Sequence, residues 1–132
     1  YARPVVEYLW NRTTEGLHEE GINLDYSQRI KQAVKIPVLC TGGFQTGSFM
    51  REAIGGGKCD AVTVARPLLA NPDLPLILAR GEEISQRKRC TYCNKCLVHV
   101  LEDPLGCYEV DRYGGDYDEM IRNVMDFYAD DV

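Results

Sequence analysis

The sequence KIPVLCTGG, residues 35–43, and the sequence CDAVTVARPLL, residues 59–69, decide the predicted fold. Each is a short apolar run, rich in β-branched residues, that ends in turn-forming residues, which is typical of a buried strand. Between them, residues 46–54 carry apolar side chains at helical spacing, and the glycines at 55–57 end that helix. Strands joined by a helical crossover lie parallel in one sheet. The two stretches therefore predict a strand–helix–strand unit of an α/β fold.

Helices are expected on both sides of this unit. Residues 26–34 form the first, with Asp25 as its N-cap, and residues 72–83 form the second, which begins at a proline and ends at Gly81. The apolar positions of the first helix are Tyr26, Ile30 and Val34. Two strands leave the faces and edges of a sheet largely uncovered, so this unit is expected to be part of a larger structure.

The character of the sequence changes after residue 80. A polar stretch leads into four clustered cysteines, and residues 116–132 have the pattern of an amphipathic helix. The apolar face of that helix consists of Met120, Ile121, Val124 and Phe127. Two segments are predicted, residues 1–80 and residues 81–132.

Composition narrows the classes of function. The chain has 132 residues, which is one domain at most, and a net charge of −5, which argues against nucleic acid as a partner. No apolar run reaches the roughly 18 residues of a membrane span, and the first residues do not resemble a signal peptide. A cytoplasmic, reducing compartment is therefore expected. There, clustered cysteines indicate metal binding or redox chemistry rather than structural disulfides.

The ends of both predicted strands carry residues suited to an anion. Gly42 and Gly43 let the backbone approach a phosphate closely, and the helix that follows directs N–H groups toward it. Arg66, after the second strand, adds a fixed charge with forked donors. An ordinary tight turn and a surface arginine have the same appearance, so the alternatives stay open at this level.

The cysteines are spaced C-x2-C-x2-C-x10-C, and their positions are Cys90, Cys93, Cys96 and Cys107. Soft thiolate ligands suit an iron–sulfur cluster or zinc, and thiols without metal are the third reading. The other two cysteines, Cys40 and Cys59, stand among apolar residues of the predicted strands and are expected in the core.

The motifs IPVLCTGGF, CDAVTVARPLLANPDLP, CTYCNKC and PLGCY together resemble the C-terminal third of the old yellow enzyme family. The resemblance is strongest to its NADH:flavin oxidoreductase branch, which is related to 2,4-dienoyl-CoA reductase. It implies that the two strands are the seventh and eighth of a (β/α)8 TIM-type barrel, followed by a cysteine-rich extension and a terminal helix. It also implies that Gly42, Gly43, Ala65 and Arg66 hold the phosphate of FMN, with Ala65 where the family usually has glycine.

The same resemblance implies a [4Fe–4S] cluster on Cys90, Cys93, Cys96 and Cys107, although the loop before the fourth cysteine is slightly shorter than in the family. The parent reaction would pass a hydride from NAD(P)H to FMN and then to an activated alkene or enoyl-type substrate. Neither His18 nor His99 matches the family's catalytic motif, so the catalytic residues are unknown. The chain alone would be incomplete for turnover, and would need the rest of the barrel or self-association.

Two other readings remain. One is a non-enzymatic module in which zinc or an iron–sulfur cluster holds the cysteines together and the terminal helix is an interaction surface. The other is a remnant that binds nothing. Retention of flavin or metal distinguishes the three.

Overall fold

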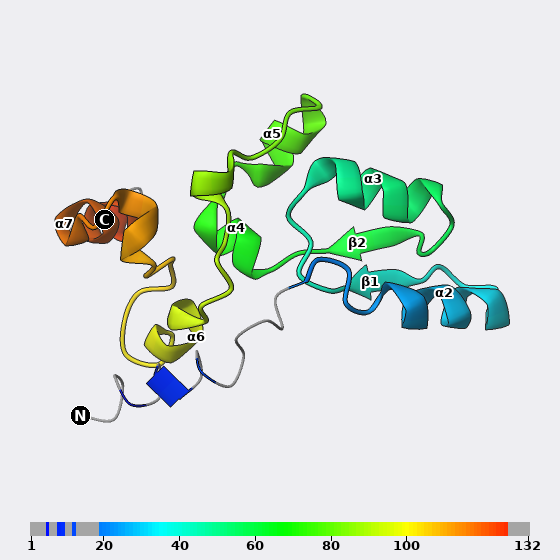
Figure 1. Cartoon of the computed structure of the whole chain (residues 1–132), viewed down its shortest axis with the longest axis horizontal. Coiled ribbons are helices and arrows are strands. Elements are labelled where there is room, and N and C mark those ends of the chain that lie inside the picture. Colours follow the sequence, from blue (N-terminus) through cyan, green and yellow to red (C-terminus); the bar gives the residue numbers. More distant parts are fainter. Residues whose placement is uncertain (1–4, 6–7, 10–11, 13–18, 127–132) are drawn as a thin grey trace.

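The computed structural model describes residue 5, residues 8–9, residue 12 and residues 19–126. Over residues 19–126 the order of elements is helix, strand, helix, strand and then further helices (Figure 1). The strands are β1 (Leu39–Thr41) and β2 (Ala61–Thr63). The helices are α2 (Leu24–Ala33), α3 (Gly47–Gly55), α4 (Arg66–Ala70), α5 (Leu74–Ala79), α6 (Lys95–His99) and α7 (Tyr117–Asp126), with 3-10 turns η1 (Gln86–Lys88) and η2 (Val110–Tyr113).

The two strands form the predicted parallel pair. Leu39 lies opposite Ala61, Cys40 opposite Val62 and Thr41 opposite Thr63. Helix α3 makes the crossover and contacts β2, while α2 contacts β1. The strand–helix–strand prediction and the parallel pairing are confirmed. The predicted burial of both strands is wrong, because only Cys40 of β1 is buried and β2 is half-buried in a sheet of two strands.

The main core lies between these strands and their helices. Phe44, directly after β1, has no exposed surface, and Cys40 and Cys59 are each 1% exposed, as the sequence predicts for these two thiols. Met50 and Ala53 of α3 cover them. The core is therefore built largely from the two strand ends and one face of α3.

The apolar stripe of α2 is not part of that core. Tyr26 is 64% exposed, and Ile30 and Val34 are also exposed, as is Leu39 of β1 beside them. The helix also begins at Leu24 with Asn23 at the N-cap position, so the prediction of Asp25 as its N-cap is wrong and Asp25 lies in the first turn. The unit presents an apolar helix face and an open strand edge on one side, as expected for part of a larger sheet.

Two short helices replace one predicted turn and one predicted long helix. The Arg66-Pro67 pair, expected to form a turn, begins α4, because proline at the start of a helix loses no hydrogen bond. The helix predicted over 72–83 is limited to α5, and Gly81, with φ of 74°, follows its end. The chain thus leaves the strand pair through two tight helical turns.

The second segment has a small core of its own. Tyr108 packs with Met120 and Val124 of α7, and both helix positions belong to the predicted apolar face. Phe127 and the rest of the predicted helix lie outside the described residues. None of the helices in the described part of the chain has the length and apolar composition that crossing a bilayer requires.

Arg112 joins the two segments. Its Nη2 donates to the carbonyl oxygens of Ala70, at 2.6 Å, and Lys88, at 2.8 Å, and to Oδ1 of Asn71 at 3.1 Å. The Asn71 amide also donates to the Lys88 carbonyl. One guanidinium therefore connects the end of α4, the turn η1 and the turn η2.

Candidate functional site

The ends of β1 and β2 lie side by side. Thr41 and Thr63, the last residues of the strands, are opposite each other and their hydroxyl groups share a hydrogen bond. Gly42 and Gly43 follow the first strand, and Ala65 and Arg66 follow the second within three residues of its end. The four residues predicted to hold a phosphate therefore follow the carboxyl ends of the two strands, and this place is called the strand edge below. Parallel sheets bind their ligands at this end of the strands.

Different features of the structure favour glycine at positions 42 and 43. A Cβ on Gly42 would stand 3.3 Å from the backbone nitrogens of Ile22 and Asn23, and the Gly42 carbonyl accepts from Gly21 N at 2.6 Å. Gly42 is thus required by the close passage of the preceding loop. Gly43 has φ of 70°, in the left-handed region that favours glycine.

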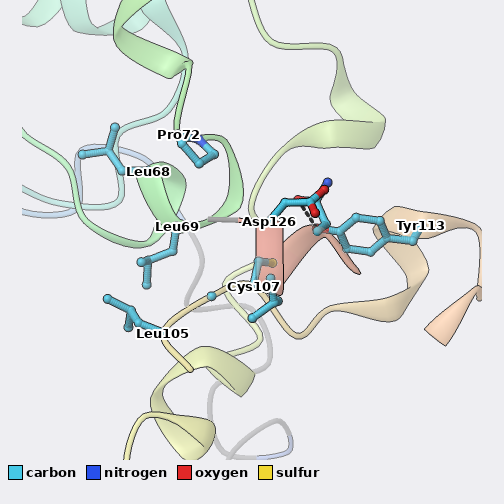
Figure 2. A pocket seen from close by; sticks show the side chains of 10 residues that line it. Leu68, Leu69, Pro72, Leu105, Cys107, Tyr113 and Asp126 are labelled. Carbon is cyan, nitrogen blue, oxygen red and sulfur yellow. Dashed lines mark hydrogen bonds between the residues drawn. The ribbon is translucent and has the colours of Figure 1, made fainter. Parts of the chain in front are cut away.

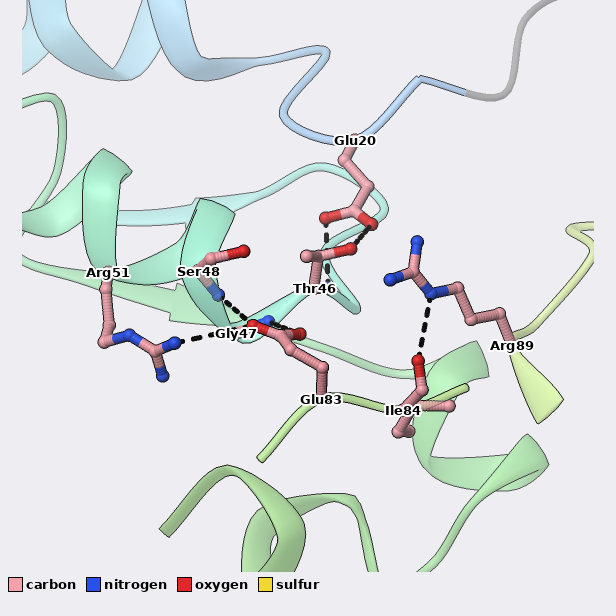
Figure 3. A network of polar contacts seen from close by, with 8 residues as sticks. All are labelled: Glu20, Thr46, Gly47, Ser48, Arg51, Glu83, Ile84 and Arg89. Atoms are coloured by element: carbon pink, nitrogen blue, oxygen red, sulfur yellow. Dashed lines mark hydrogen bonds and ion pairs between the residues drawn. The ribbon is translucent and has the colours of Figure 1, made fainter. Parts of the chain in front are cut away.

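The N-terminus of α3 is already occupied by carboxylates (Figure 3). Glu83 accepts from the backbone N–H groups of Gly47, at 2.8 Å, and Ser48, at 2.6 Å, and Glu20 accepts from Thr46 N at 3.1 Å. The expectation that this helix end directs its N–H groups to a phosphate is therefore wrong for these three residues. A carboxylate is what a helix N-terminus attracts.

Arg66 is held by the cysteine segment. Its Nη1 donates to Oδ1 of Asn94 at 2.6 Å and to the carbonyl oxygen of Tyr92 at 3.5 Å. The guanidinium carbon stands 5.2 Å from the centre of the Tyr92 ring, in cation–π geometry. The fixed charge predicted for the site is therefore present at a defined position.

Tyr92 joins the two halves of the site. Its ring is buried, its hydroxyl donates to the carbonyl of Gly43, and its ring faces Arg66. Burial, followed by the nearby charge of Glu20, raises the pKa of Tyr92 to about 12, so the hydroxyl stays protonated and able to donate. The sequence predicted only a packing role for this tyrosine, because its partner Gly43 is 49 residues away along the chain.

Gln45 forms a second link between the loop after β1 and the cysteine segment. The buried amide of Gln45 accepts from Cys90 N at 2.9 Å and donates to the Cys90 carbonyl at 3.2 Å. The paired bonds satisfy the backbone of Cys90 as a neighbouring strand would. The start of the cysteine segment is therefore fixed to the loop after Gly43.

The four clustered cysteines differ in the side chains that neighbour them. Burial raises the pKa of Cys90, and the neighbouring Cys107 and Cys96 act in the same direction. The pKa of Cys93 is raised to about 11, again first by burial, but its side-chain neighbours are Thr91 and Glu109. Glu109 is itself buried and bound to Lys95 at 2.9 Å. The side chain of Cys93 thus interacts with the carboxylate of this ion pair.

The donor chemistry suits an iron–sulfur cluster, but the arrangement does not. All four thiols are partly buried and unpaired by disulfides. In the part of the chain that the structure describes, no three His, Cys, Asp or Glu side chains are grouped as a metal site. The ligand set remains a prediction from the sequence, and no electron-transfer step follows from this geometry.

His99 has a packing role near the cysteines. Its ring stacks on Tyr108 with centroids 3.8 Å apart, and its Nδ1 lies 2.7 Å from Asp103. His18, the other histidine considered, lies outside the described residues. Neither supplies a catalytic group that can be assigned.

An apolar cavity of about 470 Å³ adjoins the fourth cysteine. Figure 2 shows Leu69, Leu105 and Cys107 on its wall, with Tyr113 and Asp126 across from them. The cavity lies between α4 and α7, on the far side of α4 from β1 and β2 (Figure 1).

Known proteins resemble this chain over most of its length. It is 32% identical over 116 residues to a cinnamate reductase of Clostridium sporogenes, 34% over 98 residues to a bilirubin reductase of Mediterraneibacter gnavus and 34% over 76 residues to an NADH oxidase of Thermoanaerobacter brockii. These alignments cover 81, 73 and 58% of the chain. The chain is homologous to part of the NADH:flavin oxidoreductase, or old yellow enzyme, family. No family model matches it.

The homology is partial on the family's side. The chain spans 17, 15 and 12% of the length of the three relatives, so it corresponds to a fragment of a larger homologue. Membership of the oxidoreductase family agrees with the resemblance carried by the motifs. In this fragment, Gly42, Gly43, Ala65 and Arg66 follow the carboxyl ends of the two parallel strands.

Proposed function

We propose that the chain is the phosphate-binding portion of an FMN-dependent NAD(P)H oxidoreductase. Residues 1–80 supply the last two βα units of a (β/α)8 barrel, and residues 81–132 supply the cysteine segment and terminal helix. The flavin and NADH chemistry named for the relatives supports this assignment. Turnover needs the remaining strands of the barrel, from a longer chain or another molecule.

The observation that supports the proposal most strongly is that Gly43 and Arg66 lie together at the strand edge. Gly43, with its left-handed backbone, and Arg66, with its fixed guanidinium, both contact Tyr92 at that edge. Backbone N–H groups at a glycine turn and one arginine are sufficient to bind a phosphate. Glu20 is the nearby opposing charge, and it is already bound to Thr46.

FMN and the protein have separate roles in this proposal. FMN supplies the hydride chemistry, and the protein supplies binding and orientation. Arg66 fixes the phosphate end by charge, while Gly43 allows close approach of the backbone. The substrate class is an activated alkene or enoyl compound, an inference supported by relatives named as reductases of cinnamate and bilirubin.

Phosphate binding is testable on the 132-residue chain. Titration of the ¹⁵N-labelled chain with FMN, and separately with inorganic phosphate, is expected to shift the amide signals of Gly43 and Arg66. Arg66→Gln should weaken FMN binding at least about tenfold, because a charge-assisted contact is lost. Arg80→Gln is the matched control, since Arg80 is exposed and pairs only locally with Glu82. Equal binding by Arg66→Gln and the wild type would contradict the proposal.

The [4Fe–4S] cluster requires a separate test. Iron and zinc are measured after purification without air, on the wild type, Cys90→Ser and the core control Cys59→Ala. Iron that is lost only in Cys90→Ser would support ligation by the clustered cysteines. Absence of both metals from the wild type would show that these thiols serve another purpose.

A further inference from the structure

Tyr92 adopts an unusual backbone conformation for a bulky residue. Its φ is 58°, in the left-handed region that costs L-residues with large side chains conformational energy. Such strain persists only where surrounding contacts fix it, and it concentrates at functional positions. The contacts that fix Tyr92 are therefore informative.

The Tyr92 N–H donates to Cys90 Sγ at 3.4 Å within the cysteine segment, whereas its side chain reaches the residues proposed to bind phosphate. The hydroxyl donates to the Gly43 carbonyl, and the ring carries the Arg66 guanidinium on its face at 5.2 Å. A Cβ placed on Gly43 would stand 3.5 Å from the Tyr92 ring, so any larger residue at position 43 would touch that ring. One side chain thus touches the glycine turn and the arginine at once.

Asn94 completes the arrangement. Its φ is 59°, a conformation that asparagine tolerates well, and its Oδ1 accepts from Arg66 Nη1 at 2.6 Å. The contacts described for Arg66 use Nη1 alone, which leaves the other edge of the planar guanidinium directed elsewhere. A guanidinium fixed through one nitrogen is pre-organised to receive an anion on its remaining donors.

We propose that Tyr92 and Asn94 are positioning residues for the phosphate site, so that the cysteine segment acts as a clamp on the turn after β1 and on Arg66. The inference rests on the proposed function and deepens it. The paired bonds between Gln45 and Cys90 anchor the same segment to the same loop, two residues beyond Gly43.

The test measures ligand affinity in two variants. Tyr92→Phe removes only the hydroxyl, and Asn94→Gly removes the acceptor while keeping a residue that adopts positive φ. Tyr117→Phe, at an exposed position of α7, is the matched control. Each variant is titrated with FMN, inorganic phosphate and riboflavin, which lacks the phosphate.

The expected result is a roughly tenfold loss of FMN and phosphate affinity in both variants, with riboflavin binding unchanged and the control equal to the wild type. If the wild type binds FMN and both variants bind it equally well, the positioning role is overturned and the proposed function stands. If the wild type binds neither FMN nor phosphate, the proposed function fails and the inference fails with it.

A measurement on the unmodified chain covers the case in which a variant does not fold. Slow rotation of the Arg66 guanidinium, seen as separate Nη signals by NMR, is expected if Asn94 and Tyr92 hold it. A single averaged signal in the wild type would overturn the inference without any variant.

Discussion

The two segments of this chain are stabilised in different ways. Residues 19–79 bury an apolar core around the parallel strands, whereas residues 82–126 bury only a small cluster around Tyr108 and depend on polar side chains that bind backbone groups. The polar side chains that bond between the segments include Arg112, Gln45, Asn71, Glu83, Arg66 and Tyr92. We therefore expect residues 82–126 to act as a cover that directional bonds hold on the first segment.

The largest effect should come from the core of the first segment. Phe44→Ala is expected to lower the free energy of unfolding by about 4 kcal/mol, because a fully buried ring leaves a cavity. Urea denaturation followed by circular dichroism measures it. Met120→Ala, in the smaller cluster, should cost about 2 to 3 kcal/mol. Equal losses in the free energy of unfolding would show that the two cores contribute equally to stability.

Removal of the link between the segments should cost less. Arg112→Met keeps the length of the side chain but loses its bonds to the Ala70 and Lys88 carbonyls, with an expected loss of about 2 kcal/mol. Hydrogen exchange should then increase in α7 and η2 before it increases in β1 and β2. Uniform acceleration across the chain would contradict the idea of a cover on a separate unit.

Glu83 is a polar link from the second segment to the N-terminus of α3 in the first. Burial acts to raise its pKa, but the N–H groups of Gly47 and Ser48 outweigh it and hold the pKa below its ordinary value of 4.5. A carboxyl with a lowered pKa stabilises the fold above that ordinary value, and the contribution is lost as the pH falls through the lowered pKa. Glu83→Gln should cost about 1 kcal/mol at pH 7 and reduce the acid sensitivity of unfolding. An unchanged pH profile would remove Glu83 from this role.

The smallest effect is expected on the open face of α2. Ile30 is 53% exposed, so Ile30→Lys should change the free energy of unfolding by less than about 0.5 kcal/mol. Its effect should instead appear in self-association, measured by sedimentation, because the exposed apolar stripe is interrupted. A large loss of stability would mean that this face is covered in solution by a part of the chain outside the described residues or by a second copy.

The sequence was informative wherever the deciding contacts were local. Apolar runs bounded by glycines predicted both strands and α3, and the alternation of strand and helix predicted their parallel pairing. Local spacing also placed Met120 and Val124 on the buried face of α7. The two core cysteines were predicted from their apolar neighbours alone.

The failures arose where distant residues decide the outcome. The spacing of the apolar residues predicted the helix α2, but it carries no information on what covers that face of the helix. The capping of α3 by Glu83 involves residues 35 or more positions apart, and the Tyr92–Gly43 bond spans 49. Spacing groups Cys93 with the other three thiols, and that ligand set stays a prediction; spacing does not reveal the interaction of the Cys93 side chain with Glu109. Pattern alone carries no information on such pairings.

The occupied N-terminus of α3 has a consequence for the salt dependence of binding. With the N–H groups of Gly47 and Ser48 bound to Glu83, the charge that the proposed phosphate site uses is that of Arg66. Exposed charge pairs weaken as the screening length falls to about 8 Å at physiological ionic strength. Phosphate affinity should therefore decline with added salt in Arg66-containing chains and be nearly insensitive to salt in Arg66→Gln.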